Sequence, residues 1–257
     1  MKDLISVITI NYNNAEGLSK TISSVVEQTY SEIEFIVIDG ASKDASADVL
    51  EASKDKISKL VSEPDTGIYD AMNKGIKLAR GEFLLFLNSG DFLTNPKALS
   101  DFVAHEKFSG DIIYGDYKFE NGEKIYPDTL PPNYFMKTSL PHQSTLFKSD
   151  VFDEMGYYDE SYKMGADRAF FLKCFVSNKF TFSHVPYLLT KFDLQGISNN
   201  PEYLLRKQAE DTRMLKSFYG DKYEIYLAEI EAARKMKRAQ KNSIKGIIKR
   251  IKNRIFK

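Results

Sequence analysis

The chain has 257 residues, with 36 basic and 36 acidic side chains, so its formal net charge is zero. Hydrophobic residues make up 42% of the chain, which excludes wholesale disorder. Its apolar runs are shorter than the ~20 residues that cross a bilayer, and its first residues lack a signal-peptide pattern. The single cysteine, Cys174, excludes an internal disulfide and a cysteine-based zinc site, and we expect it to be a buried thiol. These features predict a cytoplasmic protein with one large α/β domain, or with one domain and a small appendage.

Apolar, β-rich runs alternate with amphipathic segments in the first 114 residues. We expect strands over 4–12, 34–38, 59–62, 82–87 and 111–114, and helices over 15–28, 45–56, 68–80 and 96–107. Gly81 is expected to end the third helix. Strands that alternate with short helices predict a doubly wound, mostly parallel sheet with helices on both faces.

The pattern changes after residue 116. Asn121-Gly122 predicts a β-hairpin, and the prolines between 127 and 141 predict an irregular loop. Short helices and strands follow over 150–193, and the chain from 201 onward reads as mostly helical. We therefore divide it into segments 1–116, 117–200 and 201–257.

Polar side chains follow each of the first four predicted strands. They lie at 11–14, 39–44, 63–67 and 88–91, and ligands of doubly wound sheets bind at the carboxyl ends of the strands. The chain lacks the glycine-rich loops that hold dinucleotides or P-loop phosphates. A cluster of oxygen donors suits Mg²⁺ or Mn²⁺ that bridges phosphate groups.

Four sequence blocks contain these residues: Ser6–Asn13, Ile38–Asp44, Glu63–Gly75 and Phe86–Asp91. In this order and spacing they resemble family 2 glycosyltransferases, in particular the enzymes that build bacterial surface polysaccharides such as colanic acid. The similarity continues through His142-Gln143, Phe152–Gly156, Ala166-Asp167 and Gly196–Ser198, and covers about residues 4–200.

The resemblance implies a GT-A fold, with a nucleotide-sugar-binding half over 1–116 and an acceptor-binding half over 117–200. Residues 201–257 are then a helical extension. The implied enzyme is a hexosyl- or N-acetylhexosaminyltransferase that uses a nucleotide-diphosphate donor with inversion. UDP is the expected nucleotide, with GDP and dTDP left open, and the expected acceptor is a glycan or a polyprenyl-linked sugar.

The resemblance also implies roles for individual residues. Thr9 and Tyr12 would line the nucleobase pocket, Asp39 would accept a hydrogen bond from the base, and Asp65 would lie nearby. Asn73 and Lys74 match the family's helix that faces the donor. The whole donor-binding set is Thr9, Asn11, Tyr12, Asp39, Asp65, Asn73, Lys74 and Asn88.

The metal motif departs from the family pattern. Many relatives have Asp-x-Asp-Asp where this chain has Asn88-Ser-Gly-Asp91. Asp91 is therefore the expected ligand of Mn²⁺ or Mg²⁺, and Asn88 would hydrogen-bond the donor ribose or phosphate. With fewer carboxylates, the diphosphate must supply more of the ligands.

Asp167 matches the family's catalytic base, which takes a proton from the acceptor hydroxyl. The alternative is that Asp167 caps a helix over 168–176. His142 and Gln143 are expected to contact the acceptor or the diphosphate, with a structural hydrogen bond as the alternative for His142. His105 and His184 read as structural.

The C-terminal segment is strongly basic. Residues 234–257 hold eleven basic residues and no acid, which leaves residues 1–233 with 25 bases against 36 acids. Ile244, Ile247, Ile248, Ile251 and Ile255 recur at helical spacing. Such a helix can lie on an anionic membrane, which predicts a peripheral protein on the inner face of the cell membrane. The alternatives are packing on the body or on a second subunit of an oligomer. Nucleic acid is not expected as a partner, because Phe256 is the tail's only aromatic residue.

Two other functions compete with sugar transfer. A sugar-nucleotide pyrophosphorylase shares a related α/β half, but needs a glycine-rich first loop with arginine where this chain has Asn11–Asn14. A non-catalytic lipid- or nucleic-acid-binding protein would use the basic tail and would leave the aligned motifs unexplained.

Overall fold

The computed structural model describes residues 3–192 and 204–255. Its first strand, β1 (Ile5–Asn11), is buried along its whole length. It lies between β2 (Ile33–Asp39) and β4 (Phe83–Phe86) and pairs with both in parallel, and β3 (Lys59–Ser62) pairs in parallel with β2. The predicted parallel arrangement of the first half is therefore present, and four strand ends meet at one edge of the sheet.

The sheet becomes antiparallel where the second half of the chain joins it. β8 (Thr145–Lys148) inserts between β4 and β6 (Ile112–Phe119) and is antiparallel to both. β9 (Phe182–Lys191) is parallel to β6, and β5 (Phe92–Leu93) closes the edge on β9. Among the described residues the sheet has nine strands, in the order β3-β2-β1-β4-β8-β6-β9-β5, with β7 (Gly122–Lys124) on β6.

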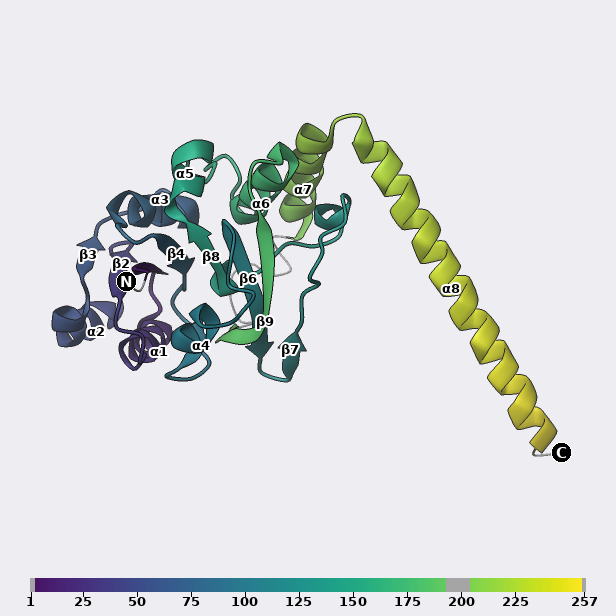
Figure 1. Cartoon of the computed structure of the whole chain (residues 1–257), viewed down its shortest axis with the longest axis horizontal. Coiled ribbons are helices and arrows are strands. Elements are labelled where there is room, and N and C mark those ends of the chain that lie inside the picture. Colours follow the sequence, from purple (N-terminus) through teal and green to yellow (C-terminus); the bar gives the residue numbers. More distant parts are fainter. Residues whose placement is uncertain (1–2, 193–203, 256–257) are drawn as a thin grey trace.

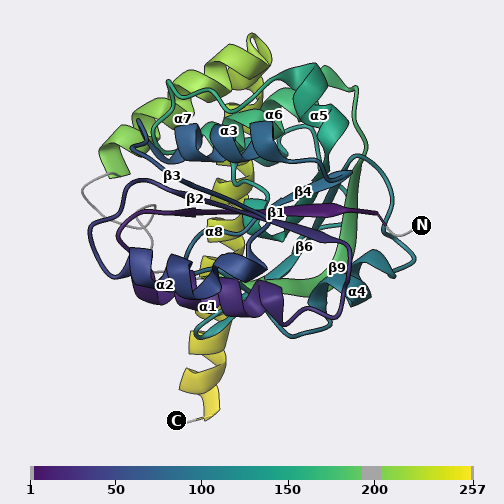
Figure 2. The same cartoon turned by 90° about the vertical axis from the view of Figure 1, so that its left-hand side faces the viewer.

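Helices cover both faces of this sheet, which confirms the predicted α/β class (Figure 2). In Figure 2, one layer contains α1 (Ala15–Val26), α2 (Ser46–Ser53) and α4 (Ala98–Val103), and the short η1 (Lys54–Lys56) follows α2 along the chain. The other contains α3 (Ile68–Leu78), α5 (Ser149–Met155), α6 (Ala166–Ser177) and α7 (Leu204–Tyr219). Each layer buries its own apolar cluster against the sheet. Cys174 lies in the α6 layer, where burial raises the pKa of its thiol to about 12.

A glycine sets the position of α3 on the sheet. A Cβ atom on Gly75 would lie 2.4 Å from Cγ2 of Ile8, so a larger residue would push the helix away from β1. The prediction that Gly81 ends this helix is wrong, because Ala79 is already extended, with ψ of 143°. Gly81 is instead needed for close packing, since a Cβ there would lie 2.5 Å from the backbone nitrogen of Ser6.

Two further predictions concern the middle of the chain. The hairpin at Asn121-Gly122 is present as β6 and β7 (Gly122–Lys124). The helix expected over 96–107 is shorter and forms α4. The loop after the hairpin contains two short 3₁₀ turns, η2 (Tyr134–Met136) and η3 (His142–Ser144). The predicted motif at 196–198 lies outside the described residues.

The C-terminal helix α8 (Lys222–Ile255) extends away from the body (Figure 1). Its first turns pack on the body, where Ile230 is 5% exposed and Glu229 accepts a hydrogen bond from Asn133. Residues 231–241 are all exposed, and the predicted isoleucine stripe lies beyond them, where side chains are not described. Among the described residues, we find no helix with the length and apolar content needed to span a membrane.

His184 on β9 is held between two carboxylates. Its Nε2 lies 3.0 Å from Oδ1 of Asp116, and its Nδ1 lies 2.6 Å from Oδ1 of Asp128. The ring stacks on Tyr114 with a centroid distance of 5.3 Å. Burial disfavours the charged ring, but the two carboxylates outweigh it and raise the pKa of His184 above its ordinary value. This is the structural role that the sequence predicts.

We expect His184→Ala to lower the free energy of unfolding by about 3 kcal/mol or more, because it leaves the buried carboxylate of Asp116 without the imidazole that compensates its charge, although the backbone nitrogen of Tyr126 still donates to it. Because the pKa of His184 is higher in the folded state than its ordinary value of 6.5, the protonated imidazole stabilises the folded protein fully below that value. This stabilisation is lost as the pH rises through the pKa of the folded state. In denaturant unfolding, the difference in the free energy of unfolding between wild type and variant should therefore be larger at pH ~6 than in alkali. A difference that stays constant would contradict this prediction. Asp128→Asn is the control, and it should lower the free energy of unfolding by less, because the Asp128 side chain is 64% exposed.

Candidate active site

The loops that follow β1 and β2 are joined through the carboxylate of Asp39. It accepts hydrogen bonds from Asn11 Nδ2 at 2.8 Å, Ser42 Oγ at 2.6 Å, Ser42 N at 3.1 Å and Ser62 Oγ at 2.8 Å. Burial raises the pKa of Asp39, but these donors outweigh burial and the net pKa is lowered. All four acceptor positions of the carboxylate are occupied. The predicted hydrogen bond to a nucleobase therefore requires one serine donor to be displaced.

The same two loops have a strained backbone. Asn13 and Ala41 have φ of 50° and 57°, in the left-handed region that residues with a Cβ seldom adopt. Ser42 Oγ accepts from the backbone nitrogen of Asn13, and Asn13 Oδ1 accepts from that of Lys43. Strain of this kind persists where surrounding contacts fix it, and it clusters at functional sites.

An exposed aromatic ring lies beside a carboxylate at this edge. Tyr12 is 67% exposed. A Cβ on Gly40 would lie 3.2 Å from the ring of Tyr12 and 2.8 Å from Oδ2 of Asp65, so glycine allows both side chains to approach. A flat apolar face next to a hydrogen-bond acceptor suits a nucleobase.

Thr9 does not share this position. It is completely buried, and its hydroxyl donates to the carbonyl of Leu87 at 2.7 Å. The prediction that Thr9 lines the nucleobase pocket is therefore replaced by a structural role, in which Thr9 ties β1 to the end of β4.

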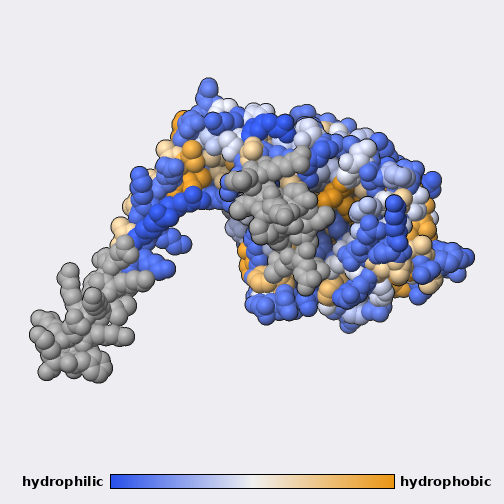
Figure 3. Space-filling view, turned by 180° about the vertical axis from the view of Figure 1, so that it is seen from behind, coloured by the Kyte–Doolittle hydropathy of each residue, from blue (hydrophilic) through white to orange (hydrophobic). Residues whose placement is uncertain are grey.

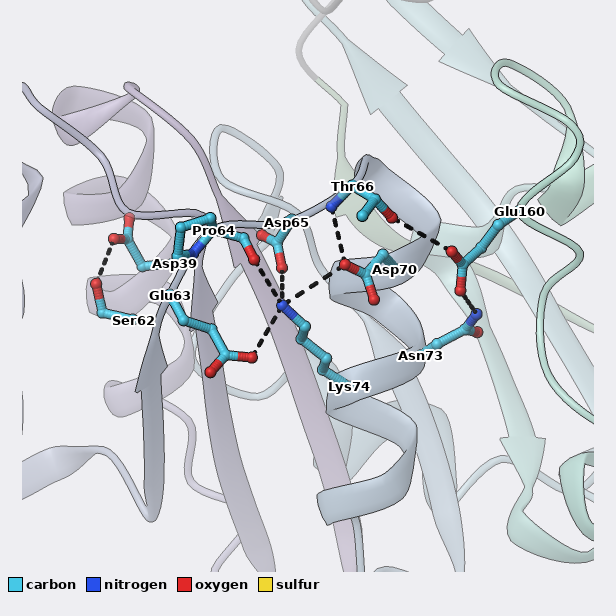
Figure 4. Close-up of polar contacts among 10 residues, drawn as sticks. All are labelled: Asp39, Ser62, Glu63, Pro64, Asp65, Thr66, Asp70, Asn73, Lys74 and Glu160. Carbon is cyan, nitrogen blue, oxygen red and sulfur yellow. Dashed lines mark hydrogen bonds and ion pairs between the residues drawn. The ribbon is translucent and has the colours of Figure 1, made fainter.

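Lys74 on α3 is surrounded by carboxylates (Figure 4). Its Nζ lies 2.6 Å from Asp65 Oδ1, 3.0 Å from Glu63 Oε1 and 3.6 Å from Asp70 Oδ2, and it donates to the carbonyl of Pro64. Burial disfavours the ammonium, but the carboxylates outweigh it and raise the pKa of Lys74 well above its ordinary value. Its charge is thus neutralised within the protein. Lys74 orients Asp65, which differs from the predicted direct contact with the donor.

Asn73 also serves the fold. It is buried, and its Nδ2 donates to the carbonyl of Tyr158 and to Glu160 Oε1, while its Oδ1 accepts from the nitrogen of Tyr158, each at 3.0 Å. Figure 4 shows Glu160 bridging Asn73 and Thr66. Asn73 is therefore corrected from a donor ligand to a residue that fixes the loop at 158–160 against α3.

The turn after β4 contains Asp91, which is 5% exposed. Its backbone nitrogen donates to the carbonyl of Asn88 at 2.9 Å, and Thr21 Oγ1 donates to its carbonyl at 2.7 Å. The described part of the chain contains no group of three His, Cys, Asp or Glu side chains placed to hold a metal. One carboxylate at the turn fits a divalent cation that takes most of its ligands from a bound diphosphate.

Asp167 lies in the first turn of α6. The N-cap is Gly165, so Asp167 is not the capping residue that the alternative interpretation describes. Tyr69 donates to Asp167 Oδ1 at 2.9 Å, and His142 Nδ1 lies 3.5 Å from Oδ2. Burial raises the pKa of Asp167, but His142 and Tyr69 outweigh burial and lower it below its ordinary value. The carboxylate is ionised at neutral pH, as a general base must be.

His142 connects this carboxylate to the turn after β4. Its Nε2 lies 3.3 Å from Nδ2 of Asn88, and the next residue, Gln143, is buried in η3. Asn88, His142 and Asp167 were predicted separately, and the structure brings them together. Tyr69 received no predicted role. Its signal in the sequence was its place within the block Glu63–Gly75.

The sequence matches the family model described as "Glycosyl transferase family 2" over residues 6–163. The chain is 33% identical over 207 residues to an uncharacterized glycosyltransferase of Mycobacterium tuberculosis, Rv1514c, which covers 77% of this chain and 78% of that protein. It is 34% identical over 130 residues to the Escherichia coli enzyme UDP-Glc:alpha-D-GlcNAc-diphosphoundecaprenol beta-1,3-glucosyltransferase WfgD, covering 50% of this chain and 51% of that protein.

Solved structures share the fold. Staphylococcus aureus TarS in complex with UDP matches with a TM-score of 0.66 at 22% identity, over 88% of this chain and 70% of that one. The mannosyltransferase PcManGT from Pyrobaculum calidifontis, in complex with GDP-Man and Mn²⁺, matches with a TM-score of 0.66 at 15% identity, over 89% of this chain and 69% of that one.

Proposed function

The chain belongs to glycosyl transferase family 2, and we propose that it transfers a hexosyl or N-acetylhexosaminyl group from a UDP-sugar with inversion. It is a glycosyltransferase with a GT-A fold that uses a nucleotide sugar. The relatives reported above do not single out the colanic acid enzymes. The family assignment also replaces the pyrophosphorylase and the non-catalytic alternatives.

The observation that carries the proposal is the ionised carboxylate of Asp167, which Tyr69 and His142 hold. In the proposed reaction the acceptor hydroxyl gives its proton to Asp167 as its oxygen bonds to the anomeric carbon. The bond from that carbon to the diphosphate oxygen breaks, and the electron pair leaves with the nucleoside diphosphate. A single displacement of this kind inverts the anomeric centre.

The leaving diphosphate gains negative charge in this step. Asp91 and diphosphate oxygens would hold Mn²⁺ or Mg²⁺, which neutralises that charge when bound. A fold neighbour contains Mn²⁺ with its donor. At the other end of the donor, Tyr12 offers its exposed ring to the base, and Asp65 lies beside it.

The acceptor class and the location extend the same proposal. The acceptor in the name of WfgD is a sugar linked to diphosphoundecaprenol, and we propose a glycan or polyprenyl-linked acceptor here, in bacterial surface polysaccharide synthesis. The basic helix α8 would then bring the enzyme to the inner face of the cell membrane, where such acceptors lie.

Calorimetry with UDP, GDP, dTDP and CDP, each with and without Mn²⁺, tests this assignment. We expect UDP to bind most tightly and Mn²⁺ to strengthen its binding. Tyr12→Ala should weaken the binding of UDP and of uridine by a similar factor, about 10-fold, because stacking of a base on an aromatic ring contributes about 1–3 kcal/mol. Asp91→Ala should abolish the effect of Mn²⁺ on UDP and leave uridine unchanged.

The two variants act as controls for each other, since one removes a contact to the base and the other a contact through the cation. Tyr12 is mostly exposed, so its loss should leave the thermal midpoint nearly unchanged. Tighter binding of GDP than UDP would contradict the choice of nucleotide. Identical binding profiles for the two variants would contradict the separate roles.

A further inference from the structure

Four side chains from four separate segments form a continuous polar chain. Asn88 follows β4, His142 begins η3, Asp167 lies in α6 and Tyr69 lies in α3. The contacts run from Asn88 Nδ2 to His142 Nε2 at 3.3 Å and from His142 Nδ1 to Asp167 Oδ2 at 3.5 Å. The last runs from Tyr69 OH to Asp167 Oδ1 at 2.9 Å. Each oxygen of the proposed base therefore faces its own donor.

The Asn88 side-chain amide can be oriented so that its oxygen accepts a hydrogen bond from His142. Its Oδ1 is buried and has no hydrogen-bond partner, and a buried oxygen without a donor is costly. A half-turn of the amide would place Oδ1, instead of Nδ2, against His142 Nε2. A doubly protonated imidazole then donates from Nε2 to Asn88 Oδ1 and from Nδ1 to Asp167 Oδ2, so both ring nitrogens have an acceptor.

We propose that His142 and Tyr69 are positioning residues that hold the Asp167 carboxylate in place, and that Asn88 acts on Asp167 through His142 instead of binding the donor. This rests on the proposed function, in which Asp167 is the base.

The charges around Asp167 favour this role. Burial disfavours the ionised carboxylate of Asp167, but His142 and Tyr69 favour it and outweigh burial. The charge of Asp167, together with burial, raises the pKa of the hydroxyl of Tyr158. His142 in turn faces Asp167 and, more distantly, Asp91, and these carboxylates raise its pKa in spite of burial. Without His142 and Tyr69, Asp167 would keep the backbone hydrogen bond from Arg168, but burial would be less opposed and the pKa of Asp167 would rise.

His142→Gln and Tyr69→Phe test the positioning role. Glutamine can still donate a hydrogen bond but carries no charge, and phenylalanine keeps the ring but loses the hydroxyl. We expect each variant to lower kcat by roughly 10–100-fold, because small displacements of a catalytic group are costly. The KM for the donor should change by less than about threefold, because in the structure His142 contacts Asn88 and Asp167, and Tyr69 contacts Asp167. The acidic limb of the kcat/KM profile should move to higher pH in both variants.

His105→Gln and Tyr157→Phe are the matched controls, since each makes the same chemical change away from the site. They should keep the pH profile of the wild type. Asn88→Ala should lower kcat while UDP affinity is retained. If Asn88 bound the donor, its removal would instead weaken UDP binding. An unmoved acidic limb in both His142→Gln and Tyr69→Phe overturns the inference, as does a loss of UDP affinity in Asn88→Ala without a loss of kcat.

A second measurement does not depend on turnover. The chain has three histidines, so NMR can follow each imidazole during a pH titration. Asp167→Asn should lower the pKa of His142 and leave that of His184 unchanged, because His184 has its own carboxylates. If His142 titrates identically in wild type and Asp167→Asn, the contact is absent and the inference fails. If Asp167→Asn transfers sugar normally, the proposed base is wrong, which is a separate result.

Discussion

Asp167→Asn should reduce the rate of sugar transfer by about 10²–10⁴-fold, the usual cost of losing a positioned base. Asparagine has nearly the same shape but cannot take the proton of the acceptor hydroxyl. Because Asp167 belongs to α6 and the nucleobase site to the loops after β1 and β2, UDP binding should remain nearly unchanged. Transfer is measured as product formed with a lipid-linked or glycan acceptor, and binding is measured by calorimetry.

The control is Asp153→Asn, which makes the same change at an exposed position of α5. It should transfer sugar at the rate of the wild type. Turnover of Asp167→Asn within about threefold of wild type would show that another group takes the proton. Loss of UDP binding in Asp167→Asn would instead indicate that the substitution disturbs the fold, and the thermal midpoint distinguishes that case.

The first half of the fold follows from local signals in the sequence. Apolar strands with helices between them can form little else than a parallel sheet, and the ends of β1 to β4 lie together as predicted. The antiparallel insertion of β8 was not predicted, because a strand of four residues has a weak local pattern. Its partners, β4 and β6, are separated from it along the chain, so pairing is decided by long-range packing.

In the candidate site, too, some features follow from local sequence signals and others depend on long-range contacts. Tyr12 and Asp91 lie just beyond β1 and β4, where the sequence places them, and Asp167 lies in the first turn of α6. The roles of Asn73 and Thr9 changed because each side chain bonds to a partner remote in sequence, the loop at 158–160 and Leu87. Spacing along the chain determines which element carries a residue, and contacts between elements determine what its polar atoms bind.

Removing the end of α8 should abolish binding to anionic vesicles. A chain that ends at Ala233 loses all eleven basic residues of the tail. Near an anionic surface such residues contribute on the order of 1 kcal/mol each, within a screening length of about 8 Å at physiological salt. The described surface of α8 is largely hydrophilic (Figure 3), which suits contact with lipid headgroups.

The fold should survive this truncation. Ile230, which is buried against the body, and Glu229, which bonds Asn133, are both retained. Residues 231–241 are exposed along their whole length, so the deleted part that the structure describes covers no core. Sugar transfer to a water-soluble acceptor should therefore remain, while transfer to an acceptor embedded in vesicles should fall.

Co-sedimentation of residues 1–257 and 1–233 measures the effect, with anionic or neutral vesicles at low and high salt. We expect the full chain to bind anionic vesicles at low salt, to release them at high salt, and to ignore neutral vesicles, because the attraction is screened and depends on lipid charge. The spaced isoleucines add burial of roughly 25 cal/mol per Å² of apolar surface, so binding that persists at high salt would indicate that they insert deeply. If the full chain ignores anionic vesicles, or if 1–233 changes its oligomeric state or thermal midpoint, α8 is a packing element instead of a membrane anchor.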